Sequence, residues 1–190
     1  MPGSAFDKLF DVAADQYGYV TTKQARETGV TANTVRMMAK RGTIQRISRG
    51  VYRFPGFPYS PYAGYMEASL WPSGVRGFVS HASALSLYGL SDVSPDRMHI
   101  TVPATFRTRR SIPERIELHQ ADLPESDIRE FEGIAATTAE RAILDCHASH
   151  LGPRLLRQAI QEAVREGLVS PERGEELAGE LLGPGKFAEP

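Results

Sequence analysis

The chain has 190 residues, 41% of them hydrophobic, and a formal net charge of −1, which is enough to build one large or two small packed domains. It contains no apolar run of eighteen residues and no N-terminal signal pattern, so we expect neither a transmembrane helix nor secretion. The single cysteine, Cys146, excludes an internal disulfide framework and fits the reducing cytoplasm, where we expect the protein to act.

The first 56 residues carry the patterns of three short helices. Ser or Thr precedes each apolar stripe of helical spacing, and Gly follows it, as is typical of helix starts and stops. The expected pairs of start and stop are Ser4 and Gly18, Thr21 or Thr22 and Gly29, and Thr31 and Gly42.

The third of these helices has two different faces. Val35, Met38 and Ala39 form its inner, apolar face. The opposite face is polar and basic, as in a helix that contacts DNA; it consists of Asn33, Arg36, Met37 and Lys40.

A basic hairpin follows. Residues 44–46 and 51–54 are expected to be strands, and Gly50 supplies the positive φ that a tight turn between them often needs. Residues 21–53 hold eight Lys/Arg against one acid, Glu27, whereas residues 61–190 carry a net charge of −6. A basic helix-turn-helix with a basic hairpin predicts a winged helix that binds DNA.

The rest of the chain reads as a second domain. Three prolines in residues 55–61 indicate an extended linker, so we expect a winged helix in residues 1–56 and a small mixed α/β domain with a helical C-terminus in residues 57–190. The predicted fold class is α+β. The elements expected in the second domain are helices at 62–70, 81–88, 141–150 (capped by Thr137 with Glu140), 155–166 and 171–182, and strands at 78–79, 98–102, 116–119 and 133–136.

The DNA-binding residues expected from this pattern have three kinds of role. Asn33 suits adenine and Arg36 suits guanine, while Thr31 and Thr34 suit phosphates. Basic residues on the hairpin suit phosphates or the minor groove. The full set is Thr31, Asn33, Thr34, Arg36, Met37, Lys40, Arg41, Arg46, Arg49 and Arg53. The alternative is a winged helix used as a protein interface, which seldom needs a net charge of +7.

A second basic cluster, Arg107, Arg109 and Arg110, follows the strand expected at 98–102. It would extend the DNA footprint, bind an acidic partner, or form a solvated loop, because loops gather charge.

Other polar residues favour structural roles. His81 precedes a helix, where a histidine more often caps or hydrogen-bonds than reacts. Asp145, Cys146, His147 and His150 lie close together but match no standard zinc spacing, so we expect no metal and no cofactor. Arg141 and Asp145 lie four apart on a helix and favour an ion pair.

We expect no catalytic residues, and therefore no enzyme. A restriction-type nuclease core needs a lysine beside paired acids, and residues 42–185 contain no lysine. An enzyme acting on nucleic acid through His81, His119 or Asp122 is the weakest alternative, because no motif gathers these residues.

Residues 23–56 (KQARETGVTANTVRMMAKRGTIQRISRGVYRFPG) resemble the N-terminal winged helix of the AbiEi family, antitoxin regulators of type IV toxin–antitoxin systems. The RGVYR motif at 49–53 is part of that resemblance. Three later segments resemble blocks of the family's C-terminal domain: VSHASALSLYGLSD, HITVP and TTAERAILD.

The resemblance implies a repressor that binds inverted repeats in double-stranded DNA upstream of its own operon. It also implies that the C-terminal domain counteracts a nucleotidyltransferase toxin encoded alongside, without a stable complex. Two alternatives stay open: an interaction protein whose acidic part binds the toxin directly, and a winged-helix regulator without a toxin.

Overall fold

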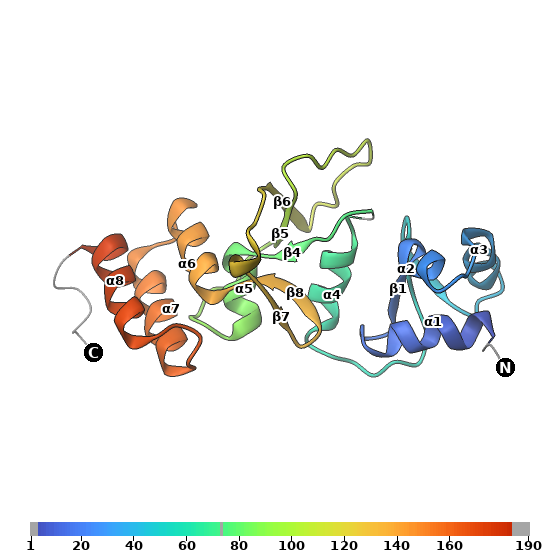
Figure 1. Cartoon of the computed structure of the whole chain (residues 1–190), viewed down its shortest axis with the longest axis horizontal. Helices are drawn as coiled ribbons and strands as arrows, with labels where there is room; N and C mark the ends of the chain where they lie inside the picture. The colour runs from blue at the N-terminus through green and yellow to red at the C-terminus, as the bar shows by residue number, and fades with distance from the viewer. Residues whose placement is uncertain (1–3, 73, 184–190) are drawn as a thin grey trace. The chain divides into compact units, whose positions relative to one another are not determined.

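A computed structural model describes residues 4–72 and 74–183 (Figure 1). The chain forms two compact units of mixed helix and strand content, which confirms the α+β class. The N-terminal unit contains the chain up to Gly77 together with Glu132–Ala135. The C-terminal unit contains Phe78–Phe131 and the chain from Ala136 onward. The functional division expected between residues 56 and 57 stays a prediction.

The N-terminal unit contains the three expected helices and the expected hairpin. Its elements in chain order are α1 (Ala5–Ala14), β1 (Tyr19–Thr21), α2 (Thr22–Glu27), α3 (Ala32–Lys40), β2 (Gln45–Ser48), β3 (Val51–Arg53) and α4 (Ala63–Leu70). Its strands form an antiparallel sheet in the order β1-β3-β2. The short strand β1 was not expected, because three residues are too few to show an alternating pattern.

Side-chain caps begin all three N-terminal helices. Ser4 and Asp7 form a capping box on α1, and Thr21 forms one with Gln24 on α2. Thr31 Oγ1 accepts a hydrogen bond from the Thr34 amide at 3.1 Å and caps α3. Each cap satisfies an amide that the first helical turn leaves without an intrahelical partner. The caps at Ser4 and Thr31 are confirmed, and Thr21 is the cap of the two alternatives for α2.

One apolar core holds α1, α2, α3 and the sheet together. Val35 of α3 is 1% exposed, and Met38 and Ala39 pack against the same cluster. The core consists of Leu9, Ala13, Val20, Ala25, Val30, Val35, Ile44, Tyr52 and Phe54. Because α3 turns Val35 inward, its opposite face lies in solvent.

The second sheet is mixed and has five strands in the order β6-β5-β4-β8-β7; all of its residues except Ile134 and Ala135 belong to the C-terminal unit. Strand β4 runs antiparallel to β5 and parallel to β8, and β5 runs parallel to β6. The elements are β4 (Phe78–Val79), α5 (His81–Tyr88), β5 (Met98–Val102), β6 (Ile116–Gln120), the 3-10 turn η1 (Glu125–Asp127), β7 (Ile128–Phe131), β8 (Ile134–Thr137), α6 (Ala139–Ala148), α7 (Pro153–Arg165) and α8 (Pro171–Leu182).

The helices of this unit pack in series: α5 on α6, α6 on α7 and α7 on α8. Gly174 allows the last contact, because a Cβ atom there would overlap Val164 Cγ2. Ser170 caps α8 and Pro171 opens it, as expected. Within residues 4–72 and 74–183, no helix combines the length and apolarity that crossing a membrane requires.

Two sequence expectations in this unit were wrong. The cap of α6 is Thr138, whose Oγ1 accepts from the Arg141 amide at 3.3 Å, and not Thr137. Thr137 is instead the last residue of β8, and its buried Oγ1 has no hydrogen-bond partner. The strand β7 was also missed, because its sequence IREF is half charged and lacks a clear apolar alternation.

Candidate nucleic-acid interface

Six cationic side chains line one groove of the N-terminal unit, which we call the basic groove. They come from α2 (Lys23, Arg26), α3 (Arg36, Lys40) and the β2–β3 hairpin (Arg46, Arg49). The remaining lining residues are Thr22, Ala32, Ala39, Gly50, Tyr52 and Gly74. None of the described residues that line the groove is acidic, so their charges have a single sign.

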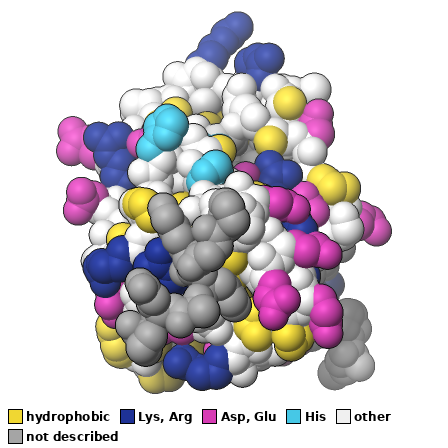
Figure 2. Space-filling model, turned by 90° about the vertical axis from the view of Figure 1, so that its left-hand side faces the viewer, with side chains coloured by type: hydrophobic (Ala, Val, Ile, Leu, Met, Phe, Trp, Pro, Cys, Tyr) yellow, Lys and Arg dark blue, Asp and Glu magenta, His cyan; other side chains and the backbone are white. Residues whose placement is uncertain are grey.

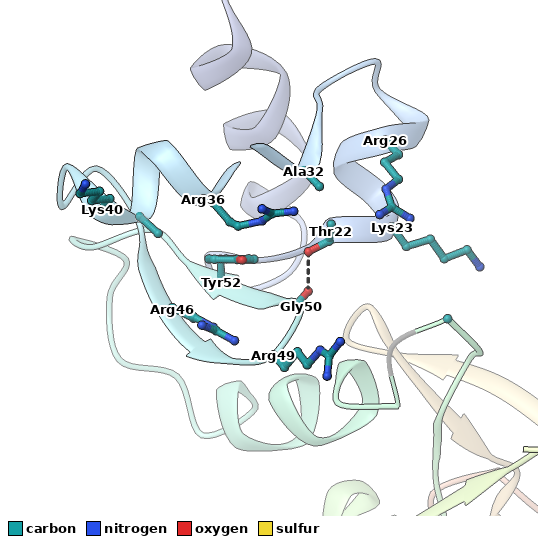
Figure 3. A pocket seen from close by; sticks show the side chains of 12 residues that line it. Thr22, Lys23, Arg26, Ala32, Arg36, Lys40, Arg46, Arg49, Gly50 and Tyr52 are labelled. Atoms are coloured by element: carbon teal, nitrogen blue, oxygen red, sulfur yellow. Dashed lines mark hydrogen bonds between the residues drawn. The ribbon is translucent and has the colours of Figure 1, made fainter. Parts of the chain in front are cut away.

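The hairpin is tied to α2, and this contact gives the groove its form. The amide of Thr22 donates to the carbonyl oxygen of Gly50 at 2.9 Å, and Gly50 adopts a φ of 88° at the hairpin turn. Figure 3 shows Arg36 on one side of the open space and Arg46 and Arg49 on the other, with Tyr52 between them. Residues from three elements therefore face one space.

Most of these cations have no acidic partner. Among the residues that the structure describes, no carboxylate lies within ion-pair distance of Lys23, Arg26, Arg36, Lys40 or Arg46. Like charges gathered without counter-charges repel one another. A bound polyanion would relieve this repulsion. Its binding is also favoured because it releases the counterions condensed on the polyanion.

The composition of the groove does not suit a small organic ligand. Its volume of about 790 Å³ lies in the range of ligand pockets. Such pockets, however, are lined mainly by apolar and aromatic side chains, and half of this lining is Lys or Arg. Its charge matches a strand of phosphates better than a drug-sized molecule.

The exposed face of α3 adjoins the groove. Asn33, Arg36, Met37 and Lys40 are all exposed, as the sequence predicted, and Met37 keeps 39% of its surface in solvent. An exposed methionine beside an amide and two cations leaves a face that can contact both base edges and phosphates. The base-reading roles of these residues stay predictions.

Other predicted site residues are placed differently. The Thr31 and Thr34 hydroxyls lie 2.9 Å apart and hydrogen-bond each other, so both are engaged at the cap of α3. Arg41 is exposed at the C-terminal end of that helix. Arg53 lies outside the groove lining: its Nε donates to the Tyr17 carbonyl at 3.3 Å, and its guanidinium lies over the Tyr19 ring.

Lys23 and Arg26 join the groove although they were not among the predicted site residues. Both are exposed on α2, which the sequence marked as a basic helix. The signal was their contribution to the +7 charge of residues 21–53. Only the fold shows that they lie beside Arg36 and Arg49.

The second basic cluster lies on the loop between β5 and β6. Arg107 folds back onto this loop, because its Nη1 donates to the carbonyl oxygens of Ala104 at 2.8 Å and Phe106 at 2.7 Å. Arg109 is exposed and Arg110 is half-buried. The bonds of Arg107 agree with the loop alternative for that residue, while any role in DNA or partner binding stays a prediction.

Several arginines of the C-terminal unit pair with carboxylates, in contrast to most cations of the basic groove. Arg97 meets Glu117 at 3.0 Å, and Arg173 meets Glu140 at 2.7 Å. Arg141 bridges Asp145 at 2.8 Å and Asp127 at 3.0 Å, which confirms the expected intrahelical pair. On the face drawn in Figure 2, acidic and basic side chains are interspersed.

Of the three residues in the enzyme alternative, His81 and His119 lie together and Asp122 forms no hydrogen bond with them. The rings of His81 and His119 stack with centroids 3.7 Å apart. Asp122 is engaged elsewhere, since its Oδ1 accepts from the Ala104 amide at 3.0 Å. The expectation for His81 was a cap or a hydrogen bond, and its Nδ1 lies 3.0 Å from Ser80 Oγ.

The structure thus defines an α+β protein with a basic, helix-lined groove in its N-terminal unit. Residues 7–55, which run from α1 to just beyond β3, match the protein family described as transcriptional regulator, AbiEi antitoxin. The resemblance inferred from the sequence is therefore confirmed over these residues, and the match covers 11 of the 12 residues that line the basic groove.

Comparison with solved structures finds the RV2827C protein from Mycobacterium tuberculosis, at 15% sequence identity, 94% coverage of this chain and 82% of that chain. The TM-score is 0.44, and a likeness at this level does not bear on function. A search of curated proteins gave no significant match.

Proposed function

We propose that this protein is a DNA-binding transcriptional repressor of the AbiEi type, with an N-terminal winged helix-turn-helix. Helices α2 and α3 would form the helix-turn-helix, and the β2–β3 hairpin would be the wing. The observation that supports this best is the basic groove, since six cations from three elements line it within a unit that matches a family of transcriptional regulators.

In the proposed complex, α3 enters the major groove of double-stranded DNA, which is wide enough for a helix. Asn33 and Arg36 contact base edges, because both side chains are exposed on the face opposite the core. The phosphate backbone follows the basic groove, where Arg46 and Arg49 of the hairpin and Lys23 and Arg26 of α2 neutralise it.

The proposed target is an inverted repeat upstream of the gene that encodes the protein, so that binding represses its own operon. The protein would act in the cytoplasm, where that DNA is reached. The C-terminal unit would supply the antitoxin role against a nucleotidyltransferase toxin encoded alongside, as the resemblance to the AbiEi family implies.

A footprint on the upstream DNA tests the repressor proposal. We expect protection of two half-sites by the parent protein and by an Arg97→Ala variant, whose altered side chain lies in the C-terminal unit. We expect protection to weaken in an Arg36→Ala variant, whose altered side chain lies in the basic groove. Equal protection by all three proteins, or none by the parent, contradicts the proposal.

Co-expression tests the antitoxin role. The full chain is expected to restore growth of cells that express the neighbouring nucleotidyltransferase, and an Arg36→Ala variant is expected to do so too when both genes have foreign promoters. Foreign promoters exclude repression of the toxin gene, so loss of rescue in this variant would contradict an antitoxin role that belongs to the C-terminal unit alone. A stable complex of the two proteins would instead support direct binding of the toxin.

A further inference from the structure

Three histidines from separate parts of the chain meet in the C-terminal unit, and the proposed DNA-binding function uses none of them. His81 is the first residue of α5 and is separated from β4 by Ser80, while His99 lies on β5 and His119 on β6. The strand order places β4, β5 and β6 side by side. In the register, Thr101 pairs with His119, so His99, two residues before Thr101, lies on the same face of the sheet.

The imidazole nitrogens are close enough to share one ion. One ring nitrogen from each histidine lies within 4.8 Å of the other two. His99 Nδ1 and His119 Nε2 are 2.9 Å apart, and the His81 ring stacks on that of His119. Zinc–nitrogen bonds of about 2.0–2.1 Å require nitrogens about 3.3 Å apart with their lone pairs converging on the ion. The three rings lie within 21° of parallel, so they must turn out of this stacked arrangement to bind one ion.

We propose that His81, His99 and His119 form a binding site for a transition-metal ion of the zinc class, each donating one imidazole nitrogen. An all-imidazole set selects Zn²⁺ and its neighbours over Mg²⁺ and Ca²⁺, which prefer oxygen ligands. Three protein ligands leave the fourth tetrahedral position open to water.

Polar groups around His81 are placed to hydrogen-bond the ring nitrogen that does not face the ion. Ser80 occupies the N-cap position of α5 but makes no capping hydrogen bond. Its Oγ instead lies 3.0 Å from His81 Nδ1 and accepts from Thr101 Oγ1 at 2.8 Å. When His81 Nδ1 donates to Ser80, Nε2 presents its lone pair to the ion, and such contacts orient metal-binding histidines.

A buried carboxylate supports the same conclusion. Asp145 Oδ2 is buried without a hydrogen-bond partner, 3.8 Å from His81 Nδ1. Its other oxygen accepts from Arg141 Nε at 2.8 Å. A cation bound to the three rings would offset the remaining negative charge, which removes part of the cost of burying that oxygen.

The backbone at His81 adds an independent sign of constraint. This residue has a φ of +52°, in the left-handed region that non-glycine residues rarely occupy. Strain of this kind clusters at binding sites because the surrounding structure holds it in place.

Metal titration of the full chain, without a histidine tag and after chelator treatment, tests the proposal. Isothermal titration with Zn²⁺ is expected to show one equivalent bound, and Mg²⁺ none. Replacement by Gln of His99 or of His119 is expected to weaken Zn²⁺ binding at least about 10-fold. The matched control is His147→Ala with His150→Ala, which removes two exposed histidines outside the cluster and should bind as the parent does.

Two further readouts keep the test independent of damage to folding. Co²⁺ bound to the parent is expected to give the visible absorption of tetrahedral nitrogen coordination, and His81→Gln is expected to lose it while keeping the parent's circular dichroism. Zn²⁺ at 100 times its Kd should raise the Tm of the parent by about 5–10 °C. Equal Zn²⁺ binding by the parent and a folded His99→Gln/His119→Gln variant, or loss in the control, overturns the proposal.

The site is separable from DNA binding, because Arg36→Ala lies in the N-terminal unit and should take up Zn²⁺ as the parent does. A parent protein that binds DNA but not Zn²⁺ would overturn only the metal site.

Discussion

The basic groove of the N-terminal unit and the C-terminal unit differ in whether their cations have carboxylate partners. In the N-terminal unit, cations from α2, α3 and the hairpin line one groove without an acidic residue among them. In the C-terminal unit, Arg97, Arg141 and Arg173 each pair with carboxylates of the same unit at 2.7–3.0 Å. Among the described residues, most cations of the basic groove therefore have no carboxylate within ion-pair distance, whereas these three arginines do.

The difference shows why net charge alone is a poor guide to function. The whole chain carries −1, which suggests no affinity for nucleic acid. What attracts a polyanion is positive charge that no neighbouring carboxylate neutralises.

The salt dependence of DNA binding should be steep. If the six groove cations contact about five or six phosphates, the affinity falls roughly 10³-fold between 50 and 200 mM salt. Fluorescence anisotropy with a labelled duplex measures this at several salt concentrations. A nearly flat dependence would mean that the groove does not face phosphates, and the contrast between the units would lose its meaning.

Arg36→Ala should weaken binding to the cognate DNA by about 1–3 kcal/mol and relax the sequence preference at one base pair. The side chain is exposed on α3 and also lines the groove. The ratio of the affinities for the cognate duplex and for a randomised duplex, measured for the parent and for the variant, gives the sequence preference. An unchanged ratio would make Arg36 a phosphate contact only.

Gly174→Ala should lower the free energy of unfolding by about 1–3 kcal/mol, because the new methyl group would overlap Val164. Gly179→Ala on the same helix is the matched control, since nothing lies within 4 Å of its Cβ position. It should raise the free energy of unfolding by roughly 0.4–1 kcal/mol. Urea unfolding measures both. Stabilisation by both variants would show that α7 and α8 are not so closely packed.

Arg49→Ala should weaken binding to all DNA sequences alike. Loss of one phosphate contact reduces the slope of log affinity against log salt by about 1. The same anisotropy series, repeated with this variant, gives the slope. A sequence-dependent loss would assign Arg49 to base reading and not to the backbone.

Arg97→Ala should have the smallest effect. Its ion pair with Glu117 joins side chains that are 57% and 44% exposed, and such pairs contribute less than about 1 kcal/mol. Neither stability nor DNA affinity should change by more than this. A large loss of DNA binding would show that cations of the C-terminal unit also face the nucleic acid.

Local signals in the sequence were enough for most of the elements. The caps at Ser4, Thr31 and Ser170 and the faces of α3 were predicted correctly, because they depend on residues within one or two turns. The same local reasoning placed the cap of α6 at Thr137, one residue early. Two adjacent threonines offer the same hydroxyl, and only the pairing of β8 with the sheet decides which one is free to cap.

The sequence by itself determined the helical faces, the hairpin and the excess of positive charge in residues 21–53, since each follows from neighbouring residues. It also placed Arg53 among the DNA contacts, which stays a prediction; in the structure Arg53 contacts Tyr17 and Tyr19. Only the tertiary structure decided which cations share a groove. The fold also brings ring nitrogens of His81, His99 and His119 within 4.8 Å of one another, because strand order and register, which no local pattern encodes, join distant parts of the chain.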